Sequence, residues 1–515
     1  MIFLALLVPF SFQGARGLYE TSEGRYAECA REMIERGDFL QPTLDYQPHW
    51  TKPPLTYWAI AAGIKLLGPG EWGIRLYSSL AFALTALAVA SIGTTLWGKT
   101  TGFLAGIIYL TSPYPTLGAS TLTTDMLLTL WETLAVLCYL RSFRAGSSQK
   151  GGIWITVMWL CFGLGFLTKG PPALIPLLPI IVWHLWHKPE TRLVGLKGLL
   201  VFAVVGLSWY VYVVLRNPGL VSYFFGQEVV GRVASSTVHN HEWYKPVTMY
   251  LPVLIFGAGA WLYFAVRTAW QERVLRPDVL WQRLKRGGSG SFLFLWLVIP
   301  LILFSLVKSR LWLYVLPLHT PVALVIARGI GGHLERFSFK RVMGLAICSA
   351  LVLVTIKGVT AYYPNKNNMR QLYNLCEEVG VHGRQFVLFD IPQLYGLQYY
   401  LDGRIQRVCL NGKEAWASEN VRDFLSKVKG TEKLASCVFI ARRDRTPELY
   451  RILKDSALSY QSREGRFWSI VSLKSQESLG FGSWRSDIDE GGARETSFGT
   501  HKVHRRLERD DENHV

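Results

Sequence analysis

Charged residues are scarce in this sequence, and several common motifs are missing from it. Asp, Glu, Lys and Arg make up 18% of its 515 residues, whereas hydrophobic residues make up 50%. Its 7 cysteines form no CxxC pair and no other spacing typical of a metal site. Neither a glycine-rich nucleotide-binding loop nor an internal repeat is present. These absences argue against a cysteine-bound metal centre, a nucleotide-binding enzyme and a repeat protein.

Long apolar runs recur up to about residue 361. Their lengths approach the roughly 20 residues that cross the hydrocarbon core of a bilayer. The clearest of these runs are 76–96, 126–140, 199–215, 292–306 and 342–359. We therefore predict an all-α polytopic membrane protein, which has the lipid bilayer as a partner.

The net charge of +18 follows from membrane topology. Basic residues gather in short loops between apolar runs, at 141–150, 188–197, 273–286 and 328–341. The positive-inside rule places such loops in the cytoplasm. The positive charge therefore does not indicate a nucleic-acid partner. We expect a multi-pass protein of the cytoplasmic (inner) membrane, with its unusual polar residues on the outer face.

With these loops inside, eleven membrane spans are expected. They lie near 1–16, 76–97, 102–119, 124–141, 153–168, 172–187, 197–215, 247–267, 291–307, 311–327 and 342–361. The apolar segment 55–67 is shorter than the usual minimum of about 17 residues, so we interpret it as an interfacial or re-entrant helix. The apolar start of the chain is also short and lacks the basic region of a signal peptide. We interpret it as a clipped first transmembrane helix, as a late start codon would produce.

Beyond residue 362 the composition becomes mixed. The segments "RQFVLFDI", "ASCVFIA" and "FWSIVSL" predict short buried strands, and "SENVRDFLSKVK" and "PELYRILKDSA" predict amphipathic helices. We therefore expect a transmembrane domain at 1–361, with a first outer loop at 17–75, and a small C-terminal extracytoplasmic α/β domain at 363–474. Residues 475–515 are rich in Gly, Ser and charge, and we expect a disordered tail there.

The first outer loop contains two acidic residues that precede its helix. The segment "RYAECAREMIERGDF" has apolar residues at helical spacing, which predicts an amphipathic helix in the membrane interface. Glu20 and Glu23 stand before this segment, where a carboxylate can face a cavity. Glu23 can instead be a partner for the dipole of the helix. We expect a functional role for Glu23.

Lys52 lies in the same outer loop, in the segment "YQPHWTKPPLTYW". The two prolines that follow it cannot continue a helix, so they hold the lysine on a rigid turn. A cation fixed at the bilayer surface suits a phosphate oxygen. A lysine that only reaches toward lipid headgroups would have the same pattern.

Asp125 begins an apolar segment in which Glu132 follows two turns later, on about the same helix face. Asp is favoured at the start of a helix, so Asp125 can be a cap. Glu132 lies inside the span, where a buried acid is costly and is usually functional. The two acids together predict a polar cavity.

Other outer turns contain cations against the positive-inside bias. Lys169 and the pair Lys308 and Arg310 lie in very short turns between spans, which favours a bound anion. Glu228 and Arg232 are four residues apart and can pair on a helix. The segment "HNHEW" resembles a set of metal ligands but has no second element at a suitable spacing, so we expect no metal site.

Seven motifs occur in order over residues 17–327. They are "SEGRYAECAREM", "KPPLTYW", "GIRLYSSL", "TTDMLL", "LGFLTKGP", "RNPGLVSYFFGQEVVGR" and "KSRLWLYVLPL". With these motifs the chain resembles the lipid-carrier-dependent glycosyltransferases of the GT-C fold, in the branch of lipid A aminoarabinose transferases and protein O-mannosyltransferases. The resemblance implies an enzyme without a cofactor that takes a sugar from a polyprenyl-phosphate donor. It passes the sugar, with inversion, to a lipid, glycan or protein acceptor at the outer membrane face.

Carried onto this sequence, the resemblance implies Glu23 as the acceptor-side carboxylate, with Glu20 in reserve, and Asp125 in the same cavity. The residues implied in substrate binding are Arg25, Lys52, Arg75, Lys169, Glu228, Arg232, Lys308 and Arg310. The family carries an Asp-Glu pair before its first-loop helix, where this chain has Ser22 and Glu23. The aminoarabinose branch has an acid before the lysine of "KP", where this chain has Thr51. That difference argues against a metal site and against aminoarabinose as the sugar.

A transporter or lipid flippase is the alternative from another functional class. Its intramembrane acids would then form a proton relay. The sequence shows no inverted repeat, and its unusual polar residues gather on one face of the membrane instead of near the midplane. Both observations favour the enzyme.

Overall fold

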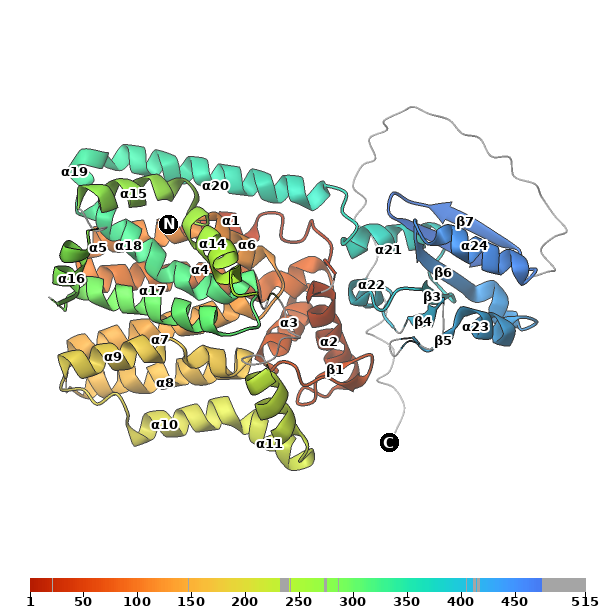
Figure 1. The fold of residues 1–515 in the computed structure, drawn as a ribbon, viewed down its shortest axis with the longest axis horizontal. Coiled ribbons are helices and arrows are strands. Elements are labelled where there is room, and N and C mark those ends of the chain that lie inside the picture. Colours follow the sequence, from red (N-terminus) through yellow and green to blue (C-terminus); the bar gives the residue numbers. More distant parts are fainter. Residues whose placement is uncertain are drawn as a thin grey trace.

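The computed structural model describes residues 1–474 except 21, 147, 232–239, 241, 273–275, 286, 404, 411–413 and 415–416. A bundle of helices occupies one end of the molecule, and a mixed sheet with its own helices occupies the other (Figure 1). Helix α20, Phe339–Tyr362, runs along the bundle toward the sheet and links the two parts. We call residues 363–474 the C-terminal sheet region. This architecture confirms the expected fold class.

Among the described residues, seven helices are long and apolar enough to cross a membrane. They are Glu71–Trp97 (α4), Asp125–Ala145 (α7), Gln149–Lys169 (α8), Leu196–Arg216 (α10, η2 and α11), Ser289–Leu306 (α17), Trp312–Gly331 (η6 and α18) and Phe339–Tyr362 (α20). Pro246–Phe256 and Gly259–Gln271 are bent by 87° and add an eighth if they form one span. The expected number of eleven spans is therefore not confirmed.

Several expected spans are short or broken helices in the structure. One consists of α5 (Lys99–Leu110) and α6 (Pro113–Ser120), because a proline ends the first helix and starts the next. Another begins with the turn η1 (Pro171–Leu174), which leaves α9 (Leu177–His187) as its helix. The N-terminal apolar run forms α1, Ile2–Phe10. Average hydropathy does not detect such breaks. A count of apolar runs therefore gives more spans than a count of unbroken helices.

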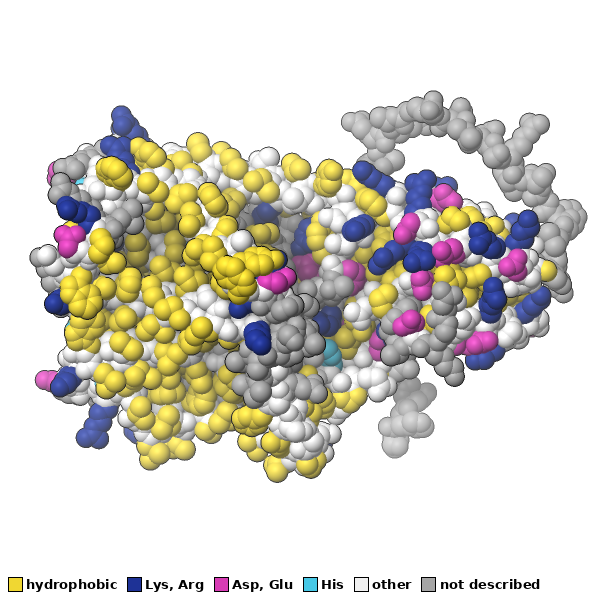
Figure 2. All heavy atoms as spheres, viewed as in Figure 1, with side chains coloured by type: hydrophobic (Ala, Val, Ile, Leu, Met, Phe, Trp, Pro, Cys, Tyr) yellow, Lys and Arg dark blue, Asp and Glu magenta, His cyan; other side chains and the backbone are white. Residues whose placement is uncertain are grey.

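The surface of the bundle is largely hydrophobic, whereas charged side chains gather over the C-terminal sheet region and at the opposite end of the bundle (Figure 2). Helices α17 and α20 bury only 28% and 22% of their apolar windows, as expected for helices that face lipid, whereas α7 buries 78% and lies in the core. The shorter helices of the bundle are α12 (Leu220–Ser222), η3 (Tyr223–Gly231), η4 (Pro246–Tyr250), α14 (Leu251–Phe256), η5 (Gly259–Trp261), α15 (Leu262–Gln271), α16 (Pro277–Lys285) and α19 (Leu334–Phe337).

The first outer loop lies between the bundle and the C-terminal sheet region (Figure 1). It contains α2 (Ser22–Arg36), the short hairpin of β1 (Thr43–Leu44) and β2 (Gln47–Pro48), and α3 (Leu55–Leu67). Helix α2 is buried on every face and not only along its apolar residues, since Glu28 and Glu32 are also buried, so the expected amphipathic helix with an exposed charged face is not observed. It packs against α3 on one side and α22, in the C-terminal sheet region, on the other. The loop is therefore held from both ends of the molecule.

The C-terminal sheet region contains six strands in the order β5-β4-β3-β6-β8-β7. They are β3 (Gln385–Phe389), β4 (Gln406–Cys409), β5 (Glu419–Asn420), β6 (Cys437–Arg442), β7 (Tyr460–Glu464) and β8 (Trp468–Leu473). Strands β5, β4, β3 and β6 pair in parallel, and β8 pairs antiparallel with β6 and β7. The helices are α21 (Met369–Glu378), α22 (Tyr395–Tyr400), α23 (Val421–Val428), η7 (Glu432–Ser436) and α24 (Thr446–Asp455). The apolar runs interpreted as strands form β3, β6 and β8.

Candidate active site

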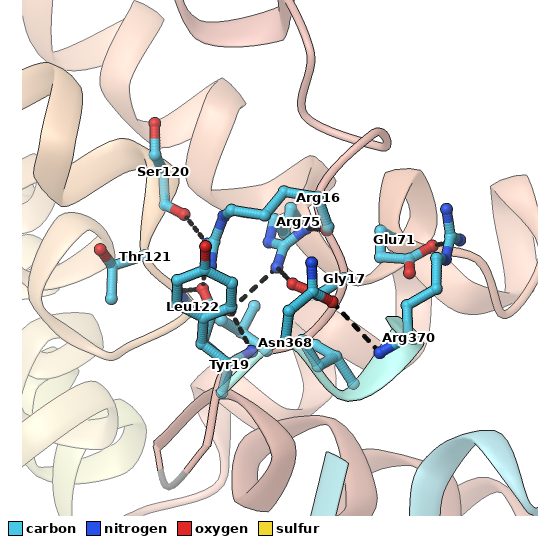
Figure 3. A network of polar contacts seen from close by, with 12 residues as sticks. Arg16, Gly17, Tyr19, Glu71, Arg75, Ser120, Thr121, Leu122, Asn368 and Arg370 are labelled. Carbon is cyan, nitrogen blue, oxygen red and sulfur yellow. Dashed lines mark hydrogen bonds and ion pairs between the residues drawn. The ribbon is translucent and has the colours of Figure 1, made fainter. Parts of the chain in front are cut away.

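Glu23 lies in the first turn of α2, is 2% exposed and has donors on both carboxylate oxygens. Its Oε1 accepts hydrogen bonds from Arg16 Nη2 at 2.7 Å and from the backbone N–H of Leu122 at 2.9 Å. Its Oε2 accepts hydrogen bonds from Arg75 Nη2 at 2.9 Å and from the backbone N–H of Tyr19 at 2.8 Å. Figure 3 shows these four donor residues around one point. The carboxylate therefore joins the first loop to two segments of the bundle.

These contacts determine the charge of Glu23. Burial alone would raise its pKa, but the charges of Arg16 and Arg75, together with the hydrogen bonds, lower the pKa to about 2. Glu23 is therefore ionised at neutral pH. Arg75, which was expected at the donor phosphate, is 1% exposed and donates also to the carbonyl oxygens of Gln13 and Gly17, at 3.1 and 2.9 Å. In the structure both residues hold the loop in place.

Glu20 has a different environment, although it lies three residues before Glu23. Its Oε1 accepts a hydrogen bond from the backbone N–H of Gly396, and its Oε2 is buried without a hydrogen-bond partner among the described residues. Burial raises the pKa of Glu20 to about 7, while the Gly396 bond and the charge of Arg25 oppose the shift. Glu20 can therefore gain or lose a proton near neutral pH.

Three basic residues of the first loop lie close together, namely Arg25 on α2 and His49 and Lys52 before α3, and Arg25 also acts on Glu20. Burial lowers the pKa of His49, and the charges of Arg25 and Lys52 lower it further, to about 4. His49 is therefore neutral at pH 7, and its Nε2 lies 2.7 Å from Thr51 Oγ1. In the described part of the chain, Arg25 forms no ion pair with a carboxylate. The group therefore has the charge that an anion requires.

Asp125 and Lys169 form an ion pair between the start of α7 and the end of α8. The Nζ atom of Lys169 also lies 4.4 Å from the centre of the Tyr314 ring. Tyr26 of the first loop lies near this ion pair. Burial raises the pKa of its hydroxyl, the charge of Arg25 lowers that pKa, and the charge of Asp125 raises it further. Asp125 and Lys169, both expected in the site, thus neutralise each other.

Arg310 is bound to the outer loop that precedes η4. Its guanidinium donates to the carbonyl oxygens of Asn240, Glu242 and Ser305, at 3.2, 2.8 and 2.9 Å. Lys308 is exposed in the turn after α17. Glu228 lies in η3, Tyr223–Gly231, but its side chain is outside the described set.

Arg232 lies outside the described residues, as do His239 and His241 of the "HNHEW" segment. Within the residues that are described, no three His, Cys, Asp or Glu side chains gather as a metal site would require.

The structure thus places Glu20 and Glu23 near Arg25 on the first loop, and Arg25 and Lys52 near His49. Lys308 and Arg310 lie on a different turn, between α17 and η6. Sequence reasoning missed two residues of this site. His49 stands three positions before Lys52, and its place beside the proline turn was the available signal. Arg16 is the last residue of the first expected span, and it was assigned no role from the sequence.

The sequence has detectable relatives. Residues 51–214 match the family described as dolichyl-phosphate-mannose-protein mannosyltransferase. The chain is 32% identical over 333 residues to the undecaprenyl phosphate-alpha-4-amino-4-deoxy-L-arabinose arabinosyl transferase of Yersinia enterocolitica, across 63% of this chain and 57% of that protein. It is 34% identical over 341 residues to the protein of the same name from Pectobacterium carotovorum, across 64% and 58% of the two chains. The chain thus spans less than two thirds of the length of these curated relatives.

The fold also has a solved counterpart. The crystal structure of ArnT from Cupriavidus metallidurans bound to undecaprenyl phosphate matches with a TM-score of 0.72 and 18% sequence identity. The match covers 93% of this chain and 98% of that chain. At this identity the similarity shows a common fold.

Proposed function

This chain belongs to the GT-C glycosyltransferases of the aminoarabinose transferase type, and from this premise we propose that it is a membrane glycosyltransferase. It moves a sugar from a polyprenyl-phosphate carrier to a hydroxyl group of a lipid, glycan or protein acceptor. The observation that carries the proposal is the group of Arg25, His49 and Lys52 on the first loop of this fold, with Arg25 shared between this group and Glu20. Such a group offers cations for a phosphate and a carboxylate for a proton.

Transfer of the sugar needs only two kinds of group, namely cations for the phosphate and a carboxylate for the proton. The acceptor oxygen forms a bond to the anomeric carbon of the sugar, while the bond from that carbon to the phosphate oxygen breaks. The carrier leaves as polyprenyl phosphate with the bonding electron pair, and the basic residues stabilise its charge. The acceptor proton passes to a carboxylate, which we assign to Glu20.

The choice of Glu20 over Glu23 rests on their contacts. A base must have a free oxygen and must take up a proton near the working pH. Glu20 has an oxygen without a partner and a pKa of about 7, whereas Glu23 is bound by four donors and has a pKa of about 2. Glu23 and Arg75 are therefore assigned to holding the loop, and Lys52 and Arg25 to the donor phosphate.

We place the first loop and the C-terminal sheet region on the outer face of the cytoplasmic membrane. The support is the distribution of charge, since helices α16 and α19 with their basic loops lie at the opposite end of the bundle from this region (Figures 1 and 2). The positive-inside rule assigns that opposite end to the cytoplasm. A polyprenyl-phosphate donor would then be used on the outer leaflet.

The proposal is tested with purified protein in lipid nanodiscs and a labelled polyprenyl-phosphate sugar. Hydrogen bonds to charged groups contribute about 1.5–3 kcal/mol, so Lys52→Ala and Arg25→Ala should each raise the KM for the donor roughly 10- to 150-fold. Lys65→Ala is the matched control, because Lys65 is an exposed lysine of the neighbouring helix α3. Movement of the labelled lipid between leaflets without transfer of its sugar would instead identify a flippase.

A further inference from the structure

The backbone of the first loop is bonded directly to the C-terminal sheet region. The N–H of Glu20 donates to the carbonyl oxygen of Asn367 at 3.0 Å, and the N–H of Met369 donates to the carbonyl oxygen of Leu18 at 2.9 Å. Figure 3 shows Asn368, between these two residues, next to Gly17 of the loop. The segment that carries Glu20 is therefore paired with residues that lie almost 350 positions later in the chain.

Helix α22 packs against the same loop at a contact between two glycines, Gly24 and Gly396. A Cβ atom at Gly24 would lie 2.1 Å from the backbone nitrogen of Gly396, so the two helices touch along their backbones. From this position the N–H of Gly396 donates to Glu20 Oε1. Four residues further along α2, Glu28 Oε1 accepts a hydrogen bond from Gln398 Nε2 at 2.9 Å. The contact therefore fixes α22 relative to the acid.

A second set of contacts fixes the C-terminal sheet region on the bundle. Glu71, in the first turn of α4, is 1% exposed and forms an ion pair with Arg370. The hydroxyl of Tyr400 donates to Glu71 Oε1 at 2.6 Å, and the hydroxyl of Tyr399 donates to the carbonyl oxygen of Pro69 at 2.8 Å. Helix α4 also carries Arg75, which binds Glu23. The loop, the bundle and the C-terminal sheet region thus form one connected unit.

We propose that the C-terminal sheet region is part of the catalytic apparatus and that Gly396 is the positioning residue for Glu20. This inference rests on the proposed transferase function. The N–H of Gly396 holds Oε1, so that Oε2 is the oxygen directed to the acceptor proton. A side chain at this position would press on the acid, because a Cβ at Gly396 would lie 3.0 Å from Glu20 Oε1 and 2.9 Å from Met369 Cγ.

The same contacts explain why Glu20 titrates near neutrality. Burial under α22 raises its pKa, and the Gly396 bond, which favours the charged form, limits the rise. The charged groups that face Glu20 are Glu23, which raises the pKa, and Arg25, which lowers it. Position and basicity therefore depend on the same helix.

The test is the pH profile of kcat for Gly396→Ala and Gly24→Ala. A base must be deprotonated, so the wild-type rate should rise with pH through about 7. Gly396→Ala keeps the backbone N–H and the burial, but its Cβ crowds Oε1 and weakens the hydrogen bond, so the midpoint should move to higher pH. Gly24→Ala separates the two helices and removes the burial as well, so the midpoint should move to lower pH.

Both variants should lose roughly 100-fold in kcat, as a displacement of about 1 Å can cause, while the KM for the donor stays unchanged. Gly344→Ala in α20 is the matched control, because a Cβ at that helical glycine meets no atom within 4 Å. A fall in kcat with an unmoved midpoint, or an unchanged kcat, would overturn the positioning role.

Glu20→Gln separates this inference from the proposed function. If Glu20→Gln stops turnover and the glycine variants do not, only the positioning role fails. If wild-type protein transfers no sugar, the proposed function fails. Hydrogen exchange at the amides of Glu20 and Met369 then tests the contact without activity, since Gly24→Ala should accelerate it and Gly344→Ala should not.

Discussion

Glu20 and Glu23 are only three residues apart, yet their surroundings give the two carboxyl groups opposite properties. The one beside two arginines remains ionised down to a pH of about 2. The other, buried under α22, holds its proton up to a pH of about 7. Which acid can accept a proton at neutral pH is therefore decided by neighbours from distant parts of the chain.

The two acids should respond differently to replacement by glutamine. Glu20→Gln should lower kcat by about 100- to 10,000-fold, the usual contribution of a positioned acid or base. It should leave the thermal unfolding temperature nearly unchanged, because a neutral amide suits a buried site. Glu23→Gln should instead lower the free energy of unfolding by about 3–5 kcal/mol, because it leaves the buried Arg75 and the half-buried Arg16 without their carboxylate.

Turnover assays and thermal unfolding in the same nanodiscs measure both effects. Full turnover in Glu20→Gln would reject Glu20 as the base. A stable Glu23→Gln protein without turnover would return that role to Glu23, the residue that the family motif first indicated.

The sequence identifies the residue types of this site but not their pairing. It predicts that Glu20, Glu23 and Lys52 share one loop, because they are close in the chain. It does not predict that Asp125 is neutralised by Lys169, 44 residues away, since neither residue type indicates a partner. The Gly396 contact is equally invisible, because a glycine in a mixed segment gives no sign of the surface that it touches.

At the scale of elements, apolar length predicts the long helices and the buried strands well. Strands β3, β6 and β8 are apolar because both faces of the sheet are covered. The edge strand β7 reads "YQSRE" and is mostly exposed, so its composition resembles that of a loop. Breaks within apolar runs are also missed, as α5 and α6 show.

One lysine of helix α20 forms hydrogen bonds to the N-terminal helix. Lys357 lies in an apolar span, and its Nζ donates to the carbonyl oxygens of Val8 and Pro9, both at 2.9 Å. These carbonyls lie at the end of α1, where the helix provides no further N–H donors. The lysine thus adds a charged donor to two carbonyl oxygens that also accept hydrogen bonds from Ser11 Oγ and Ser79 Oγ.

Lys357→Met should lower the free energy of unfolding by about 2 kcal/mol, because hydrogen bonds to charged groups contribute about 1.5–3 kcal/mol. The KM for the donor should stay the same, since Lys357 makes no contact with the first-loop cations. Chemical denaturation in detergent measures the change, and Lys340→Met, at the exposed start of the same helix, is the control. An unchanged stability would mean that water replaces the lysine.

At the scale of the whole molecule, the apolar surface of the bundle separates two polar ends (Figure 2). The C-terminal sheet region and the first loop lie together at one end, and the start of α17 lies at the other (Figure 1). Every candidate span lies between Glu71 and Tyr362, so only an even number of crossings places the first loop and the C-terminal sheet region on one side of the bilayer. The arrangement therefore fits eight crossings, with the bent pair as one span, and does not fit seven.

A reporter fused after Tyr362 should therefore signal the extracytoplasmic side, and one fused after Gly288 should signal the cytoplasm. Three candidate spans separate these positions, namely Ser289–Leu306, Trp312–Gly331 and Phe339–Tyr362, and an odd number of crossings places the two reporters on opposite sides. Paired alkaline phosphatase and green fluorescent protein fusions measure this directly. Two reporters on the same side would remove one of the three crossings. A fully inverted result would place Lys52 and Arg25 in the cytoplasm, where the proposed use of a donor on the outer leaflet is impossible.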